Sequence, residues 1–135
     1  MITICDTGPL LAYLNRNDAH HAWAIALMKQ VRAPMLVCEA VLTEVVYFLR
    51  EDGVAVDPLF ELFEREAVRL EFDISTHWPR IRTLMSRYRQ MDLADASIVV
   101  MSELNARSQV LTIDRKDFSV YRRNDRQVID FVAPQ

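Results

Sequence analysis

Short apolar runs alternate along the chain with longer segments in which apolar residues recur at helical spacing. Each run is rich in β-branched residues and is bounded by turn-forming residues, as Met1–Cys5 is followed by Asp-Thr-Gly-Pro. Runs of this kind predict short buried strands. We expect strands at residues 1–5, 35–38, 68–72, 109–113 and 128–132.

The segments between these runs predict helices. Asp57 is expected to cap a helix with Pro58 in its first turn, and Ser75 to cap another that runs to about Gln90. Asp92 opens a helix with almost no polar face, which is typical of a helix buried in the core. Further helices are expected around residues 10–14, 22–31 and 40–50.

Strands alternating with helices indicate an α/β fold, with a short parallel sheet flanked by helices on both faces. The chain has 135 residues, which suits one domain over residues 1–135. The pattern does not predict the order of the strands.

Composition narrows the range of functions. The only glycines, Gly8 and Gly53, are too far apart to form a phosphate-binding glycine loop. Cys5 and Cys38 lie in apolar runs and are expected to be reduced thiols in the core. No apolar segment is long enough to span a bilayer and no leader pattern opens the chain, so we expect a cytoplasmic protein without a membrane partner.

The net charge and the local distribution of charge favour different partners. The formal net charge of −3 argues weakly against a nucleic-acid partner, yet basic residues gather at 80–90 and 115–126. These stretches are either solvated faces or contacts for a polyanion. If they are contacts for a polyanion, the residues expected to hold its phosphates are Arg87, Arg89, Arg115 and Lys116.

Two aspartates follow predicted strands directly. In parallel sheets, ligands bind beyond the carboxyl ends of the strands, which selects Asp6 and Asp114 as functional candidates. Each could instead cap the helix that follows it, because aspartate is a favoured cap.

Three further acids are candidates for the same site. Asp92 and Asp95 are three residues apart at the start of the buried helix, so they share one face, although both could serve only as capping residues. Glu44 is the only charged residue in an otherwise apolar helical stretch, and its alternative is a solvated helix face.

A shared site for these acids would need a cation. Two carboxylates about 5 Å apart repel by about 3 kcal/mol at an effective dielectric constant near 20. Such groups must become protonated or bind cations, and oxygen ligands alone favour Mg²⁺ or Mn²⁺ over zinc. Ions of this kind can activate water against a phosphodiester, so the acids and the basic stretches indicate the same substrate class.

Four segments of the chain together resemble the PIN domain family. They are Ile4–Leu11, Thr43–Val45, Asp92–Val99 and Leu111–Phe118, and the Thr-x-Asp-x-x-Asp-Phe pattern in the last is the most specific. In size and architecture the chain resembles VapC-type toxins of type II toxin–antitoxin pairs. The resemblance covers nearly the whole chain and implies a PIN-like fold.

The resemblance also implies a function. Its expectations are endoribonuclease activity dependent on Mg²⁺ or Mn²⁺, a homodimer, and inhibition by a cognate antitoxin. The alternative is a non-catalytic PIN-like module that binds RNA or a protein. On this sequence the catalytic and metal-binding acids of the family fall at Asp6, Glu44, Asp95 and Asp114.

Further residues are expected around this site. Asp92 and Asp117 would lie just outside the metal ligands, and the Thr7 hydroxyl would orient Asp6 or a water molecule. An antitoxin would contact apolar residues of the early helices, for which ordinary core packing is the alternative. These residues are Leu11, Leu14 and Trp23.

Overall fold

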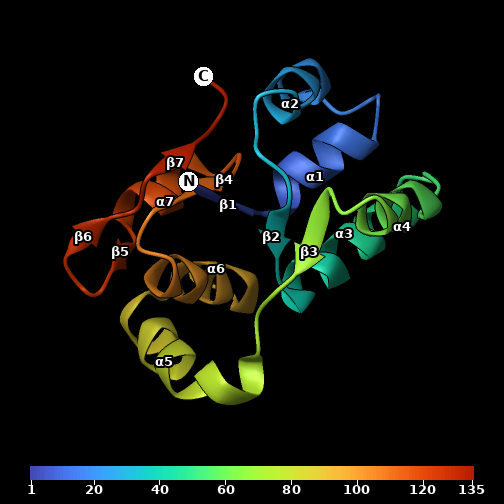
Figure 1. Cartoon of the computed structure of the whole chain (residues 1–135). Helices are drawn as coiled ribbons and strands as arrows, with labels where there is room; N and C mark the ends of the chain where they lie inside the picture. The colour runs from blue at the N-terminus through green and yellow to red at the C-terminus, as the bar shows by residue number, and fades with distance from the viewer.

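The computed structural model describes residues 1–135 and contains a five-stranded sheet in which every neighbouring pair of strands is parallel (Figure 1). The strand order is β3-β2-β1-β4-β7. The strands are β1 (Ile2–Cys5), β2 (Met35–Val37), β3 (Val68–Leu70), β4 (Ser108–Leu111) and β7 (Phe131–Val132). The predicted α/β fold with a short parallel sheet is confirmed.

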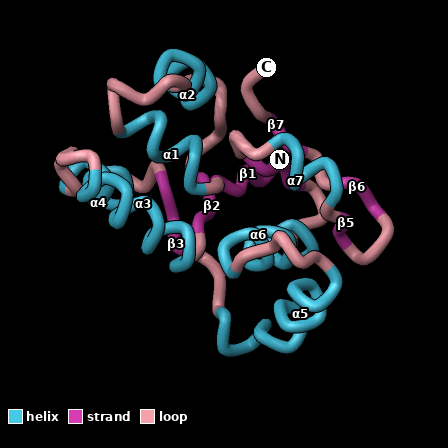
Figure 2. Tube along the Cα trace, turned by 180° about the vertical axis from the view of Figure 1, so that it is seen from behind, coloured by secondary structure: helices cyan, strands magenta, loops and turns pink.

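Seven helices flank the sheet on both faces. α6 packs against β1 and β4 with α5 outside it, while α1 and α2 lie across the sheet from them (Figures 1 and 2). The helices are α1 (Thr7–Leu14), α2 (His21–Met28), α3 (Glu39–Glu51), α4 (Asp57–Glu64), α5 (Ile74–Arg87), α6 (Leu93–Leu104) and α7 (Arg115–Val120). None of them is both long enough and apolar enough to cross a bilayer.

The burial of α6 agrees with its sequence pattern. Every residue at positions 94–102 is buried, and the Asp92 side chain caps the helix by accepting a hydrogen bond from the Asp95 amide at 2.8 Å. Cys5 and Cys38 are free thiols in the same core, as predicted. The central helix is therefore held in place by apolar packing along nearly its whole length.

Two helix starts differ from the predictions. Asp73, not Ser75, caps α5, because its side chain accepts hydrogen bonds from the Ser75 amide at 3.1 Å and the Ser75 hydroxyl at 2.6 Å. Val56 is the capping position of α4, and Asp57 lies inside its first turn. In both cases an aspartate still places negative charge at the positive end of the helix dipole.

The predicted last strand at 128–132 is wrong as a single element. The chain forms an antiparallel hairpin from β5 (Arg122–Arg123) and β6 (Gln127–Val128), and only then enters β7. Asn124 and Asp125 in the hairpin turn have positive φ angles of 51° and 65°, which these two residue types tolerate better than most. The predicted run is therefore split at Ile129 and Asp130, and only its last two residues pair with β4.

Candidate active site

Asp6 and Asp114 lie at the carboxyl edge of the sheet, one after each of two neighbouring strands. β1 and β4 pair in register up to Cys5 and Leu111, and the Asp6 amide donates to the Leu111 carbonyl at 2.9 Å. Both aspartates also cap the next helix, Asp6 through the Thr7 amide and Asp114 through the Asp117 amide. The capping alternative is correct for both, and it does not remove them from the edge where ligands bind.

Asp6 is an almost fully buried carboxylate. Its side chain is 8% exposed and accepts hydrogen bonds from the Thr7 amide and the Thr112 hydroxyl, each at 2.8 Å. Burial raises the pKa of Asp6 to about 6, with the charges of Glu44 and Asp92 adding to the rise and the two hydrogen bonds opposing it. The surroundings of Asp6 therefore disfavour its charged form.

Thr112 joins two of the acids. Its fully buried hydroxyl donates to Asp6 and accepts from the Asp114 amide at 3.0 Å. One side chain therefore sets the position of both aspartates. Sequence reasoning gave Thr112 no role, although it is the threonine of the Thr-x-Asp pattern.

Glu44 reaches the same edge from α3. The Thr7 hydroxyl donates to Glu44 Oε1 at 2.6 Å, while the Thr7 amide bonds Asp6. The expectation that the Thr7 hydroxyl orients Asp6 is therefore wrong, because that hydroxyl is engaged by Glu44. Thr7 instead ties the two acids together through different atoms.

Asp95 lies in the first turn of α6 and is 9% exposed. The Tyr121 hydroxyl donates to Asp95 Oδ2 at 2.6 Å. Burial raises the pKa of Asp95 to about 7; the charges of Asp92, Asp6 and Asp114 add to the rise, and the tyrosine hydrogen bond opposes it. No sequence signal predicted Tyr121, which is 26 residues away in the chain.

The two outer acids differ in exposure. Asp92 is exposed and acts as the cap of α6, whereas Asp117 is half-buried in the first turn of α7. Partial burial and the adjacent Asp114 raise the pKa of Asp117. All six predicted acids thus contribute negative charge to one edge of the molecule.

No lysine or arginine forms an ion pair with these carboxylates. The ion pairs of the structure join Arg69 to Glu71, and Arg80 and Arg87 to Glu103 and Asp125, and none includes a predicted site acid. The donor set consists of oxygen atoms with unneutralised charge, which suits Mg²⁺ or Mn²⁺. The residues therefore fit a divalent cation in chemistry.

The acids are not assembled into a closed cage. No three acidic, histidine or cysteine side chains are close enough together to hold an ion, and the four cavities of the molecule are lined by other residues. The shared site expected for these acids is therefore not assembled as a closed metal site. The acids occupy an open edge, where hydroxyl and amide donors hold each of them in place.

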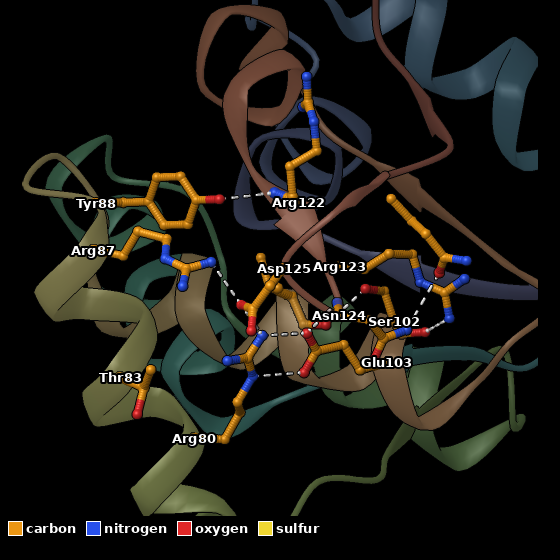
Figure 3. A network of polar contacts seen from close by, with 12 residues as sticks. Arg80, Thr83, Arg87, Tyr88, Ser102, Glu103, Arg122, Arg123, Asn124 and Asp125 are labelled. Atoms are coloured by element: carbon orange, nitrogen blue, oxygen red, sulfur yellow. Dashed lines mark hydrogen bonds and ion pairs between the residues drawn. The ribbon is translucent and has the colours of Figure 1, made fainter.

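The basic stretch at 80–90 is partly neutralised. Arg80 contacts Glu103 through two nitrogens at 3.0 and 2.8 Å and Asp125 at 2.8 Å, and Arg87 contacts Asp125 at 2.7 Å (Figure 3). Arg87 is therefore bound to the β5–β6 hairpin. Arg89 is exposed and forms no ion pair, so it remains available for a phosphate.

The second basic stretch is divided in the same way. Arg115 donates to the carbonyls of Ala133 and Pro134 at 3.1 and 3.4 Å, and its guanidinium carbon lies 5.7 Å from the Phe131 ring centre. Lys116 is exposed and has no ion pair. Arg115 thus fastens the C-terminal segment while keeping its charge.

The residues proposed for antitoxin contact are half-buried. Leu11 and Leu14 pack against the core, and Trp23 meets the His20 ring edge to face at a centroid distance of 6.4 Å. More exposed apolar side chains lie on α3 and α4, where Tyr47 is 57% and Phe60 is 54% exposed. Core packing accounts for much of the area of the three predicted residues.

Comparison with known proteins places this arrangement in a family. Residues 3–124 match the model of the PIN domain. No curated protein matches the chain. PIN domains are generally nucleases and typically use divalent metal ions. A match over most of the chain, together with acids at the carboxyl edge of a parallel sheet, shows that this protein belongs to the PIN domain family.

Proposed function

We propose that the protein is an endoribonuclease dependent on Mg²⁺ or Mn²⁺, with a cation held by Asp6, Glu44, Asp95 and Asp114. One observation carries the proposal: Asp6 and Asp95 are two nearly buried carboxylates in each other's electrostatic field, and neither has a cationic partner. A protein retains such unfavourable charge where function requires it.

A divalent ion, when bound, supplies Lewis-acid polarisation of a phosphodiester and lowers the pKa of water. The chain's own residues prepare the site. Thr112 and the Thr7 amide each occupy one lone pair of Asp6, which leaves further lone pairs on both oxygens. Tyr121 holds one oxygen of Asp95, and the Thr7 hydroxyl holds one oxygen of Glu44. Each acid thus keeps a fixed orientation with free acceptor capacity.

Arg89 and Lys116 are the proposed phosphate contacts beside the acids. Arg89 is three residues from Asp92, and Lys116 is two from Asp114, so both belong to segments that enter the carboxyl edge. Arg115 bonds only neutral carbonyls and contributes long-range attraction, whereas the ion pair with Asp125 neutralises Arg87.

The test measures RNA cleavage and metal binding together. The purified protein should cut RNA with Mg²⁺ or Mn²⁺ and stop when a chelator is added. Asp95→Asn should abolish cleavage and weaken Mn²⁺ binding measured by calorimetry, because it removes a charged ligand from the site. The matched control is Asp57→Asn, an exposed aspartate in the first turn of α4, which should behave as the wild type.

The absence of a closed ligand cage favours one alternative, a PIN-like module that binds RNA or protein without cutting. The same measurements separate the two functions. RNA binding without cleavage at any concentration of Mg²⁺ or Mn²⁺ would establish the alternative.

We further propose that the protein is a VapC-type toxin, acts as a homodimer, and is inhibited by an antitoxin. A chain with net charge −3 and an open acidic edge attracts cationic side chains, so an antitoxin arginine or lysine could pair with Asp6 and Asp95. Leu11, Leu14 and Trp23 would supply apolar contact through their exposed parts. If the antitoxin works this way, saturating it should suppress Mn²⁺ binding; inhibition with unchanged Mn²⁺ affinity would contradict the mechanism.

A further inference from the structure

The amino edge of the sheet, opposite the acids, carries a basic hollow. β1 runs from the N-terminus towards α1, so the starts of β1, β2 and β4 lie at the edge away from Asp6 and Asp114 (Figure 1). A cavity of about 510 Å³ opens there, and its wall includes the start of β1 and the segments that enter β2 and β4. The cavity continues along the edge strand β3 as far as Glu71. Its charged residues are Arg32, Arg69, Arg107 and Glu71.

A second cavity extends this hollow. It measures about 300 Å³, shares Met1 and Arg107 with the first, and adds Arg123 and Asp130 to the lining. Arg123 donates to the carbonyls of Ser102 at 2.6 Å and Ala106 at 3.4 Å, and its buried Nε has no acceptor. Four guanidinium groups therefore line the hollow with only two carboxylates, in a chain whose net charge is −3.

The cations of the hollow are available to a ligand. Arg32, Arg69 and Arg107 are all exposed. Arg32 and Arg107 form no ion pair, and Arg69 approaches Glu71 only at 3.8 Å with both side chains more than half exposed. An exposed pair of this length contributes little, so a phosphate can replace it. One guanidinium group can bind two phosphate oxygens at once, and the hollow is larger than a single phosphate group.

We propose that this hollow binds backbone phosphates of the RNA at a distance from the bond that is cut. The proposal rests on the proposed nuclease function, since the RNA is the same molecule. β1 has four residues, so at about 3.3 Å per residue the two edges of the sheet are only about 13 Å apart. A folded RNA can therefore contact both edges at once, whereas an oligonucleotide of two or three nucleotides bound at the acids is too short to reach the hollow.

The test is the binding of two RNA probes by the full-length protein in a chelator, so that no cleavage occurs. The probes are a folded RNA hairpin with single-stranded flanks and a short uridine oligonucleotide. The triple variant Arg32→Gln, Arg69→Gln, Arg107→Gln should bind the hairpin at least about tenfold more weakly, and its slope of log affinity against log salt should fall by about two. Its affinity for the oligonucleotide should not change.

The matched control removes three exposed arginines elsewhere, on the α1–α2 loop, α3 and α5. It consists of Arg16→Gln, Arg50→Gln and Arg82→Gln, which change the net charge by the same amount. An equal loss of hairpin affinity in both triple variants would overturn the proposal in favour of general electrostatic attraction. A second result would also overturn it: the hollow triple variant binds the hairpin as the wild type does but loses binding of polyglutamate. That result would assign the hollow to an acidic protein segment instead.

Failure of this proposal differs from failure of the nuclease function. A protein that binds the hairpin through the hollow but never cuts RNA with Mg²⁺ or Mn²⁺ contradicts only the proposed activity. A protein that cuts RNA, and whose hollow triple variant binds the hairpin as the wild type does, contradicts only the hollow.

Discussion

The two edges of the parallel sheet carry opposite charges in different surroundings. At the carboxyl edge, acids such as Asp6 and Asp95 are nearly buried, held by hydroxyl and amide donors, and without cationic partners. At the amino edge, Arg32 and Arg107 are exposed and form no ion pair. The destabilisation caused by the acids at the carboxyl edge therefore depends on their protonation. The attraction of anions to the arginines at the amino edge depends instead on the salt concentration.

The largest difference between the two edges should appear in the pH dependence of the stability of the metal-free protein. The pKa values of Asp6 and Asp95 in the folded protein are raised from an ordinary 3.8 to about 6 and about 7. Between the ordinary and the raised pKa values the folded state binds more protons than the unfolded state. The stability of the folded state therefore falls as the pH rises from about 4 to about 7. Asp95→Asn should remove the larger part of this pH dependence and stabilise the protein above pH 7 by a few kcal/mol.

Urea unfolding in a chelator at several pH values measures this effect. The hollow triple variant, Arg32→Gln with Arg69→Gln and Arg107→Gln, should keep the pH dependence of the wild type. A wild-type pH profile in Asp95→Asn would show that the acids at the carboxyl edge cause no such destabilisation.

A pair of buried threonines gives a medium effect. Thr112→Val removes the hydroxyl that positions Asp6 and Asp114 and should lower RNA cleavage about tenfold to a hundredfold, as losses around metal sites do. Thr3→Val at the other end of the sheet removes the acceptor for Gln109 Nε2 at 3.1 Å and should cost about 1 kcal/mol of stability without a loss of activity. Cleavage kinetics and thermal unfolding of both variants check the contrast, and equal activity in the two would contradict it.

Single arginines should give the smallest effect. Arg89→Gln and Arg107→Gln should each reduce the salt slope of RNA binding by about 0.7, the value for one phosphate contact on a single strand. Arg89→Gln should act on both short and folded RNA, because Arg89 belongs to the carboxyl edge, and Arg107→Gln only on folded RNA. The same response to both RNA lengths in the two variants would remove the distinction between the edges.

The prediction from sequence was most successful where local pattern and burial agree. The run from Asp92 to Leu104 has almost no polar face, and α6 is the buried central helix. The strand-ending positions of Asp6 and Asp114 were also predictable, because residues after parallel strands lie at one edge whatever the strand order. The last apolar run was misjudged, since Val128 pairs with β5 in the hairpin and only Phe131 and Val132 join the main sheet.

The partners of the acids could not be predicted in this way. The hydrogen bond from Tyr121 to Asp95 joins residues 26 apart, and the hydrogen bond from Thr112 to Asp6 joins residues 106 apart. Contacts of this range depend on which strands pair and on how helices pack on the sheet, and hydrophobic periodicity specifies neither. The same holds for Arg87, whose neutralisation by Asp125 requires the hairpin to fold against α5.

The sequence by itself determined the strands and helices, the buried central helix and the acids that end β1 and β4, because each depends on neighbours a few residues away. Only the tertiary structure decided which charges are free. It neutralised Arg80 and Arg87, which belong to one basic stretch, and it gathered Arg32, Arg69 and Arg107 from three distant segments into one hollow. Electrostatic interactions act through space over distances near 10 Å, so the charge pattern of the surface belongs to the fold and not to the order of the residues.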